Sequence, residues 1–331
     1  LYHHGYANPN ATYKDARMTA ELVETAREKV AKALGCYPDE IFFTSGASES
    51  NGLIQANFVL TVDERSHHSF ERMTGINQYG KVKAIPLVVS ETGEWLINEV
   101  KANPEQEYFL DMTQGIGKMK INLHDMPNVI YASASGHKFG GILGCGILYI
   151  RHDKQSKIRP LIVGSQEKGI RGGTQNVPAI VCFGEAIEKA TKDIDKNQDK
   201  IRKVTNYIYT KIKTRDAIPV DDTPLFIYES IPVNVRMAEP YTNVINITFN
   251  HLTATAAVQI FDKLGFNISA GSACNSESER PSEAYLASGY TEDEAMRTIR
   301  ISVGKNNTIR EAKKFIKALK KIVALYDEGD D

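Results

Sequence analysis

Lys138 is the residue of this sequence with the clearest potential for covalent chemistry. It lies in the loop SGHKFGG, residues 135–141, between two apolar runs at 129–132 and 147–150. The runs predict strands, and the glycines let a ligand approach the backbone closely. A lysine held in a partly dry site at a strand end can act as an amine and form a Schiff base. Most lysines are exposed and solvated, so this interpretation depends on which other residues the fold brings to the loop.

Two further predicted strands end in residues that could hold a cofactor. Residues 41–44 predict a strand that turns, through the small residues SGASESN at 45–51, into a helix. Free backbone N–H groups and the helix dipole at such a turn can bind phosphate, and an ordinary capped turn is the alternative. Asp111 follows a strand at 108–110, at the edge where open α/β sheets bind ligands. Its alternative is a turn or N-cap residue.

The adjacent histidines His67 and His68 follow an apolar run at 58–62. A metal site would need further ligands at workable spacing, and none is evident nearby in the sequence, so we expect no metal here. An imidazole could instead stack on an aromatic cofactor or shuttle protons, or both residues could be ordinary polar loop residues. The glycine-rich basic loop at 164–174 could hold an anion or could be a flexible connection.

The four cysteines are scattered and form no CxxC pair, which argues against a zinc knuckle and a disulfide framework. Cys274 lies at the centre of a Ser- and Gly-rich loop at 269–281, where a thiol is accessible and can react. We interpret Cys36, Cys145 and Cys182 as structural. Arg300 interrupts an apolar strand at 298–302, so it either points away from the core or binds a carboxylate.

The elements that must position these residues indicate two domains. The chain has 331 residues and a formal net charge of −1, which gives no general attraction to nucleic acid or membranes. Strands and helices alternate up to about residue 150, as in a mostly parallel sheet flanked by helices. After a charged helical connection at 192–202, residues 244–326 predict a smaller α+β domain. We expect a large α/β domain at 10–195 and a small domain at 196–331, with residues 1–9 packing on the small one.

A membrane segment and a secretory signal are not evident, so we expect a cytoplasmic protein.

Six short motifs occur in the order found in pyridoxal-phosphate-dependent cysteine desulfurases of the class V aminotransferase family, which the sequence resembles from about Asn8 to about Tyr326. They are TSGASESN at 44–51, DMTQG at 111–115, SGHK at 135–138, RGGT at 171–174, SAC at 272–274 and IRISVG at 299–304. The resemblance implies a PLP-dependent transferase-like large domain, a mostly parallel sheet and pyridoxal 5′-phosphate (PLP) as cofactor.

The resemblance also implies roles for matching residues. Lys138 forms the covalent link with PLP, Asp111 pairs with the pyridine nitrogen, and Gln114 bonds the ring hydroxyl. His67 stacks on the ring and helps proton transfer, and Arg300 binds the carboxylate of the substrate. The phosphate is held by Ala47, Ser48, Ser135 and His137, together with Thr174, which reaches the site of the partner subunit in a homodimer.

The implied activity converts L-cysteine to L-alanine and leaves a persulfide on Cys274. The sulfur then passes to an acceptor protein of the iron–sulfur scaffold or tRNA-thiolation type, without direct contact with nucleic acid. Two alternatives stay open. One keeps the cofactor but acts as a selenocysteine lyase or another class V lyase or transaminase, and the other is a catalytically degenerate dimeric binding protein.

Two segments of the family pattern have no counterpart in the sequence. One is an opening strand and turn resembling YLDNAATT, and the other is a strand with an Asn-Asn-Glu segment between Leu87 and Tyr108. Either residues are missing from the sequence or the chain is a shortened relative, and we favour missing residues. An intact mass near 36.8 kDa would contradict that hypothesis.

Overall fold

The computed structural model describes residues 7–73, 81–213, 216–219, 226–229, 231–238, 243–271 and 281–326. The chain divides into two compact units, Leu1–Val88 with Trp95–Ile194 and Val89–Glu94 with Asp195–Asp331. The boundary expected between residues 195 and 196 lies one residue from this division. Two segments differ from the expectation. Residues 89–94 join the second unit, and residues 7–9 belong to the first, where the neighbouring Asn10 side chain donates to Gln175.

The first unit is built on a six-stranded sheet with the order β1-β6-β5-β4-β3-β2. Its strands are β1 (Ile41–Thr44), β2 (Leu60–Val62), β3 (Val82–Pro86), β4 (Glu107–Asp111), β5 (Val129–Ser135) and β6 (Gly146–Ile150). β2 to β5 pair in parallel, whereas β6 is antiparallel to both β5 and β1. Every residue of β1, β5 and β6 is buried, which explains their continuous apolar runs. The expected mostly parallel sheet is confirmed.

Helices cover both faces of this sheet, as the alternation along β1 shows. Phe42 belongs to a core cluster with Leu53 and Ile54 of α2 (Ala47–Asn57). The next residue, Phe43, packs edge-to-face on Phe183 of α4 (Val177–Lys192). α2 and α4 therefore lie on opposite faces.

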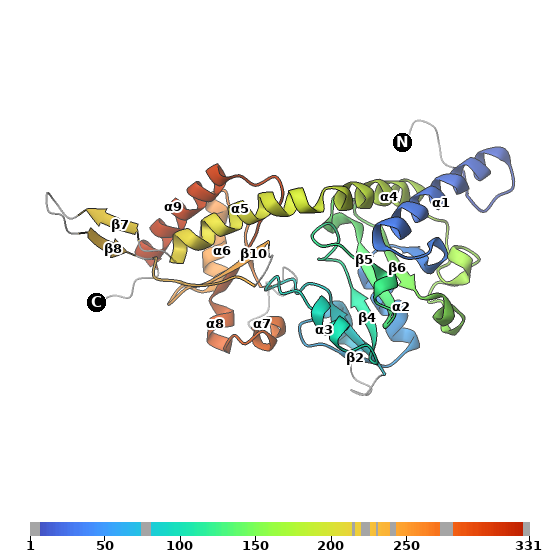
Figure 1. Cartoon of the computed structure of the whole chain (residues 1–331), viewed down its shortest axis with the longest axis horizontal. Coiled ribbons are helices and arrows are strands. Elements are labelled where there is room, and N and C mark those ends of the chain that lie inside the picture. The colour runs from blue at the N-terminus through green and yellow to red at the C-terminus, as the bar shows by residue number, and fades with distance from the viewer. Residues whose placement is uncertain are drawn as a thin grey trace. The chain divides into compact units, whose positions relative to one another are not determined.

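A second helix accompanies α4. α1 (Lys14–Leu34) is followed by Gly35, whose left-handed conformation (φ 63°) and N–H bond to the carbonyl of Ala31 form a C-cap. α1 and α4 lie side by side (Figure 1), and they approach so closely that a Cβ on Gly184 would meet the Cα of Ala26 at 2.8 Å. The predicted charged connection is two helices rather than one, because α4 stops at Lys192 and α5 (Ile194–Lys213) begins two residues later.

The second unit contains a four-stranded antiparallel sheet with the order β11-β12-β10-β9. Its strands are β9 (Asn234–Arg236), β10 (Val244–Thr248), β11 (Ser269–Ala270) and β12 (Thr298–Ser302), and β7 (Asp216–Pro219) and β8 (Phe226–Glu229) form a separate hairpin. The helices are α5, α6 (Ala254–Lys263), α7 (Glu283–Ala287), α8 (Glu292–Met296) and α9 (Ile309–Tyr326). The described part of this unit is an α+β domain, as the sequence predicted.

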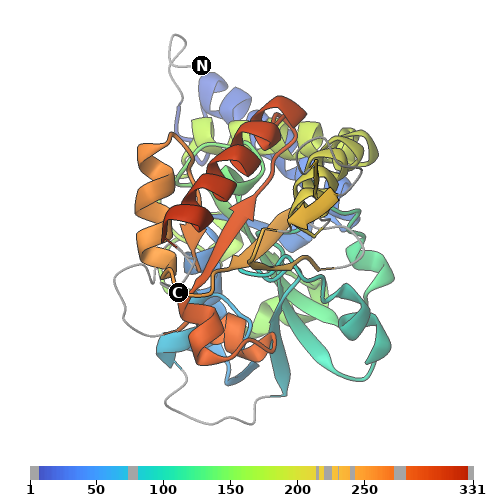
Figure 2. The ribbon, with the colours of Figure 1, turned by 90° about the vertical axis from the view of Figure 1, so that its left-hand side faces the viewer.

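The alternation along β10 separates a core face from a polar face in this unit. Ile245 and Ile247 belong to a cluster with residues of α5, α6 and α9, and Figure 2 shows α6 (orange) and α9 (red) over the strands. Phe261 of α6 stacks on Phe315 of α9, with ring centroids 5.2 Å apart. Asn246 lies between the two isoleucines, is paired with Arg300 of β12, and donates to the carbonyl of Glu91.

The interval between Leu87 and Tyr108, which lacks the strand and Asn-Asn-Glu segment of the family pattern, forms a continuous connection. Val88 and Trp95 make a β-bridge, and α3 (Ile97–Ala102) then leads into β4. β3 pairs directly with β4 over five residues, from Val82 with Glu107 to Pro86 with Asp111, so no strand lies between them. Among the described residues, none of the helices combines the length and the apolar composition needed to cross a membrane.

Candidate active site

Several strand ends meet at one edge of the first unit's sheet. Asp111, the last residue of β4, pairs with Ser133, two residues before β5 ends at Ser135. Gly146, the first residue of β6, pairs with both Ser135 and Thr44, the last residue of β1. Because β6 runs against its neighbours, it begins where they end. Candidate residues that lie far apart in the sequence are therefore brought to a common edge.

The N-terminus of α2 is fixed at this edge. The backbone N–H of Ala47 donates to Oγ of Ser135 at 2.8 Å, so two of the expected phosphate-binding residues contact each other. Ser48 follows at an exposed position of the first helical turn, where N–H groups have no acceptor within the helix. A Cβ on Gly146 would lie 2.5 Å from the Cα of Gly46. Gly46, which precedes α2, therefore packs directly on β6. Ser48, in the first turn of α2, faces outward.

Lys138 lies just beyond β5, in the 3₁₀ helix η5 (Gly136–Lys138). The carbonyl of Gly136 holds this turn by accepting from the N–H groups of Phe139 and Gly141. Lys138 and His137 are both exposed, which differs from the expected partly dry lysine. The reason is the following loop, whose residues 142–144 are themselves open to solvent. Partial burial and the charge of Lys138 lower the pKa of His137.

Asp111 is a buried carboxyl, 7% exposed, at the end of β4. One of its oxygens accepts from the backbone N–H of Thr113 at 2.9 Å. Burial raises the pKa of Asp111, and hydrogen bonds from Thr113 and Asn51 and the charge of Lys138 oppose that rise without cancelling it. Such a carboxyl favours a cationic or N–H partner. Gln114, in the turn that follows, is half-buried and accepts from Lys118 at 2.9 Å.

His67 lies in the loop that follows β2, immediately before the 3₁₀ helix η3 (His68–Met73). Its ring centroid is 3.9 Å from that of His68, with the two rings tilted. Burial, followed by the charges of His68 and Lys138, lowers the pKa of His67 to about 4. His67 is therefore neutral at physiological pH. The charge of Lys138 acts on both His67 and Asp111, so we expect these three candidates to contribute to one site.

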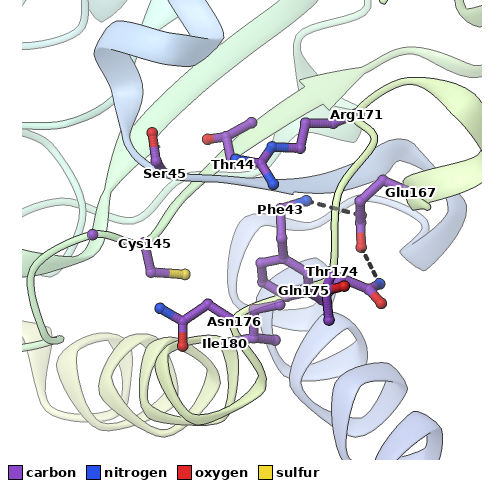
Figure 3. Close-up of a pocket in the computed structure, with 11 residues that line it drawn as sticks. Phe43, Thr44, Ser45, Cys145, Glu167, Arg171, Thr174, Gln175, Asn176 and Ile180 are labelled. Carbon is purple, nitrogen blue, oxygen red and sulfur yellow. Dashed lines mark hydrogen bonds between the residues drawn. The ribbon is translucent and has the colours of Figure 1, made fainter. Parts of the chain in front are cut away.

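Thr174 lies in the glycine-rich loop at 164–174 of the first unit. It is exposed and lines a pocket together with residues of β1 and of the loop at 144–145 (Figure 3). Arg171 in this pocket is paired with Glu49 at 2.8 Å. Buried Glu167 accepts from the backbone N–H of Phe43 and from the side chain of Gln175. The lining includes none of Lys138, His67 and Asp111.

Two expected residues belong to the second unit. Nη1 of Arg300 donates to the carbonyl of Ser90 at 3.0 Å, while its buried Nε has no partner among the described residues. A guanidinium in this state retains donors for a carboxylate. Cys274 lies outside the described residues, so the structure gives no position for its thiol.

The structure also identifies polar residues that the sequence analysis did not single out as functional. Asn51 and Ser133 are completely buried and hydrogen bond each other, and Asn51 also bonds Ser69. The available signal was the position of Asn51, three residues before buried Ile54 on the face of α2 that also buries Ala47 and Leu53. Buried polar groups require partners, so an amide at that position predicts a network, although not the identity of its members.

Comparisons with known proteins agree with this arrangement. The sequence model of the class-V aminotransferase family matches residues 1–69 and 58–315. The cysteine desulfurase IscS of Methanosarcina thermophila is 29% identical over 360 residues, covering 96% of this chain and 85% of the relative. IscS of Dictyoglomus turgidum is also 29% identical over 360 residues, with coverage of 96% and 88%. Both alignments are longer than the 331-residue chain, so these relatives carry residues with no counterpart here.

Solved structures give the same result. The NifS-like protein from Rickettsia africae ESF-5 superposes with a TM-score of 0.80 at 27% identity, covering 96% of this chain and 92% of that one. A structure described as SspA in complex with cysteine has a TM-score of 0.68 at 26% identity and covers 93% of each chain. The resemblance and the fold class expected from the sequence are both confirmed. The chain belongs to the class-V aminotransferase family.

Proposed function

We propose that this protein is a PLP-dependent cysteine desulfurase that converts L-cysteine to L-alanine and transfers the sulfur to Cys274. The observation that carries the proposal is the grouping of Lys138 with buried Asp111 and neutral His67 at one edge of the sheet. The names of the relatives and the cysteine complex of one structural neighbour support the substrate. The expected acceptor is a protein of the iron–sulfur scaffold or tRNA-thiolation type.

The chemistry of the residues present fits PLP. A buried carboxyl with a raised pKa, Asp111, suits the N–H of a protonated pyridine ring. The first turn of α2 offers backbone N–H groups of the kind that bind phosphate, with Ser135 beside it. A neutral imidazole, His67, can lie against an aromatic ring without adding a second positive charge. Lys138 supplies the exposed amine that a carbonyl group needs.

When bound, PLP supplies an electron sink for negative charge on the α-carbon of the substrate. Arg300 binds the substrate carboxylate, and the amine of Lys138 takes the α-proton. The thiolate of Cys274 then attacks the sulfur of the substrate, so that an S–S bond forms while the C–S bond breaks. The electron pair of the broken bond stays with the substrate carbon, which is protonated to give alanine. Cysteine and the Cys274 thiol thus yield alanine and a persulfide.

A homodimer is part of the same proposal. Two exposed apolar loops of the first unit support it, and we name them the apolar patch: Ile142 and Leu143 in one, and Leu161, Ile162 and Val163 in the other. Leu143 is 77% exposed and Val163 is 85% exposed. The carbonyl of Ile162 accepts from Gly172, which places the second loop beside the RGGT motif. A second copy that covers the patch brings Thr174 near the partner subunit's site.

The deciding experiment is the absorbance spectrum of the purified protein with added PLP, before and after borohydride reduction. We expect a visible band and a reduced adduct that peptide mass analysis locates on Lys138. Lys138→Ala should abolish the adduct. Cysteine should then yield alanine together with a persulfide on Cys274, and Cys274→Ala should keep the band but lose the persulfide. The absence of both the band and the adduct would contradict the proposal. It would favour a binding protein without catalysis.

A further inference from the structure

Asn51 is a completely buried amide on α2 that joins three elements of the candidate site. Its Oδ1 accepts from the hydroxyl of Ser133 on β5 at 2.7 Å, and its Nδ2 donates to Oγ of Ser69 in η3 at 2.8 Å. Its side chain also hydrogen bonds toward Asp111 and lowers the pKa of that carboxyl. The bond from the Ser133 hydroxyl occupies Oδ1, so Nδ2 is the group that faces Ser69.

Ser69 passes this orientation on to His67. The backbone N–H of Ser69 donates to Nδ1 of His67 at 3.2 Å, and Oγ of Ser69 lies 3.0 Å from the same nitrogen. A backbone N–H can only donate, so Nδ1 must be the unprotonated acceptor nitrogen. Because Oγ already accepts from Asn51, its own proton is available for Nδ1. The proton of a neutral His67 then lies on Nε2.

We infer that Asn51 and Ser69 form a relay that positions His67 and holds it as the neutral tautomer with its proton on Nε2. Asn51 and Ser69 are positioning residues, since they act through the imidazole and do not touch the reacting atoms. The inference rests on the proposed function, in which His67 lies against the cofactor. It deepens that function by making His67 a donor at Nε2 and leaving the role of base to Lys138.

The charges around His67 agree with this assignment. His68 from η3 and Lys138 from η5 are the titratable groups that act on it, and both disfavour a second positive charge. Asp111 from β4 is linked to the same network through Asn51. A proton delivered to Nδ1 would break the bond from the Ser69 N–H, so protonation and loss of the relay are coupled.

The test is ¹⁵N-histidine NMR of the purified full-length chain without PLP, with the His67 resonances assigned from the His67→Gln variant. In the native protein we expect Nδ1 to give the resonance of an unprotonated nitrogen and Nε2 that of a protonated one. Asn51→Asp places an acceptor opposite Ser69, so the serine proton turns away from His67. We expect this variant to shift His67 toward the Nδ1-protonated tautomer or the cation and to raise the pH at which it titrates.

Ser66→Ala is the matched control, because it removes a hydroxyl from the same loop whose Oγ is buried without a partner in the described part of the chain. It should leave the His67 resonances unchanged. If Asn51→Asp fails to fold, Ser69→Ala takes its place as the test variant. It keeps the backbone donor but removes the hydroxyl, so it should give a mixture of His67 tautomers. In the loaded enzyme, Ser69→Ala should lower kcat on the order of tenfold with little change in KM.

A native spectrum with the proton on Nδ1 would overturn the inference, as would a folded Asn51→Asp variant with an unchanged His67 tautomer. These readouts are separate from cysteine turnover. A native Nε2-protonated tautomer in a chain that forms no alanine from cysteine would reject the proposed function and keep the relay. Alanine formation by a chain with the His67 proton on Nδ1 would support the proposed function and reject the relay.

Discussion

Arg27 and Glu167 form a buried ion pair that ties the loop at 164–174 to α1. The guanidinium donates to both carboxylate oxygens of Glu167, at 2.8 and 3.0 Å, and also to the carbonyl of Ile41. Glu167 and Lys168 both adopt positive φ angles of 45° and 55°, which non-glycine residues rarely do. The ion pair and the bonds to Phe43 and Gln175 therefore hold a strained turn in place.

Breaking this pair should destabilise the first unit strongly. Arg27→Leu leaves the Glu167 carboxylate buried without its cation, and such changes typically cost about 3–5 kcal/mol. Denaturant unfolding of the native and variant proteins would measure the loss. Lys29→Ala is the control, because its partners Glu185 and Glu188 are exposed, and it should leave stability nearly unchanged. Equal losses in the two variants would show that Glu167 is not held by Arg27.

His67 should make the protein sensitive to acid. Its folded-state pKa is lowered from 6.5 to about 4, first by burial. The unfolded chain therefore takes up this proton before the folded one does, and stability falls as the pH drops from about 6.5 to about 4. After discounting for solvent screening, the loss is on the order of 2 kcal/mol. His67→Gln should reduce it in unfolding curves across this range.

Asp111 should have the opposite effect on stability. Burial raises its pKa above the ordinary 3.8, so the folded state keeps a proton that the unfolded chain releases. Stability then falls as the pH rises from about 4 through the raised folded value. We expect Asp111→Asn to gain stability relative to the native protein, without PLP, as the pH rises over this window. A gain that is independent of pH would contradict this account.

The same variant should bind the cofactor less well. A hydrogen bond to a charged group contributes about 1.5–3 kcal/mol, so Asp111→Asn should weaken PLP binding roughly 10- to 100-fold. Equilibrium titration with PLP, followed by absorbance, measures the change. A variant that is more stable at neutral pH yet weaker in PLP binding would identify Asp111 as a residue kept for the cofactor.

Two glycines at the start of the site offer a matched pair. A Cβ on Gly146 would lie 2.5 Å from the Cα of Gly46 and 2.7 Å from the carbonyl oxygen of Ala134, and neither backbone atom can move aside easily. Gly146→Ala should therefore cost about 1–3 kcal/mol and displace the first turn of α2. Gly52 lies within α2 with nothing within 4 Å of its Cβ position. Gly52→Ala should stabilise by roughly 0.5–1 kcal/mol. Thermal unfolding would rank the two.

The apolar patch should decide the oligomeric state. Val163→Asp introduces a charge at its most exposed residue, so a dimer that buries the patch should dissociate by at least about tenfold in Kd. Sedimentation equilibrium over a range of concentrations would detect this. Leu325→Asp, at another exposed leucine, is the control and should stay dimeric. A native protein that is monomeric at all concentrations would reject the homodimer.

Local patterns in the sequence determined many of the elements. The apolar runs at 41–44 and 298–302 match β1 and β12 residue for residue, because strand spacing is set by neighbours along the chain. The six motifs identified the family because they occur along the chain in the family's order. The candidate residues Lys138, Asp111 and His67 could be singled out because each follows a predicted strand.

Only the tertiary structure decided how these pieces combine. The sequence offered no way to know that β3 and β4 pair directly across residues 87–106. It also did not reveal the links from Asn51 to Ser69 and Ser133, or from Arg27 to Glu167. These contacts join segments up to 140 residues apart, and their energy depends on burial and direction, which exist only once the chain is folded.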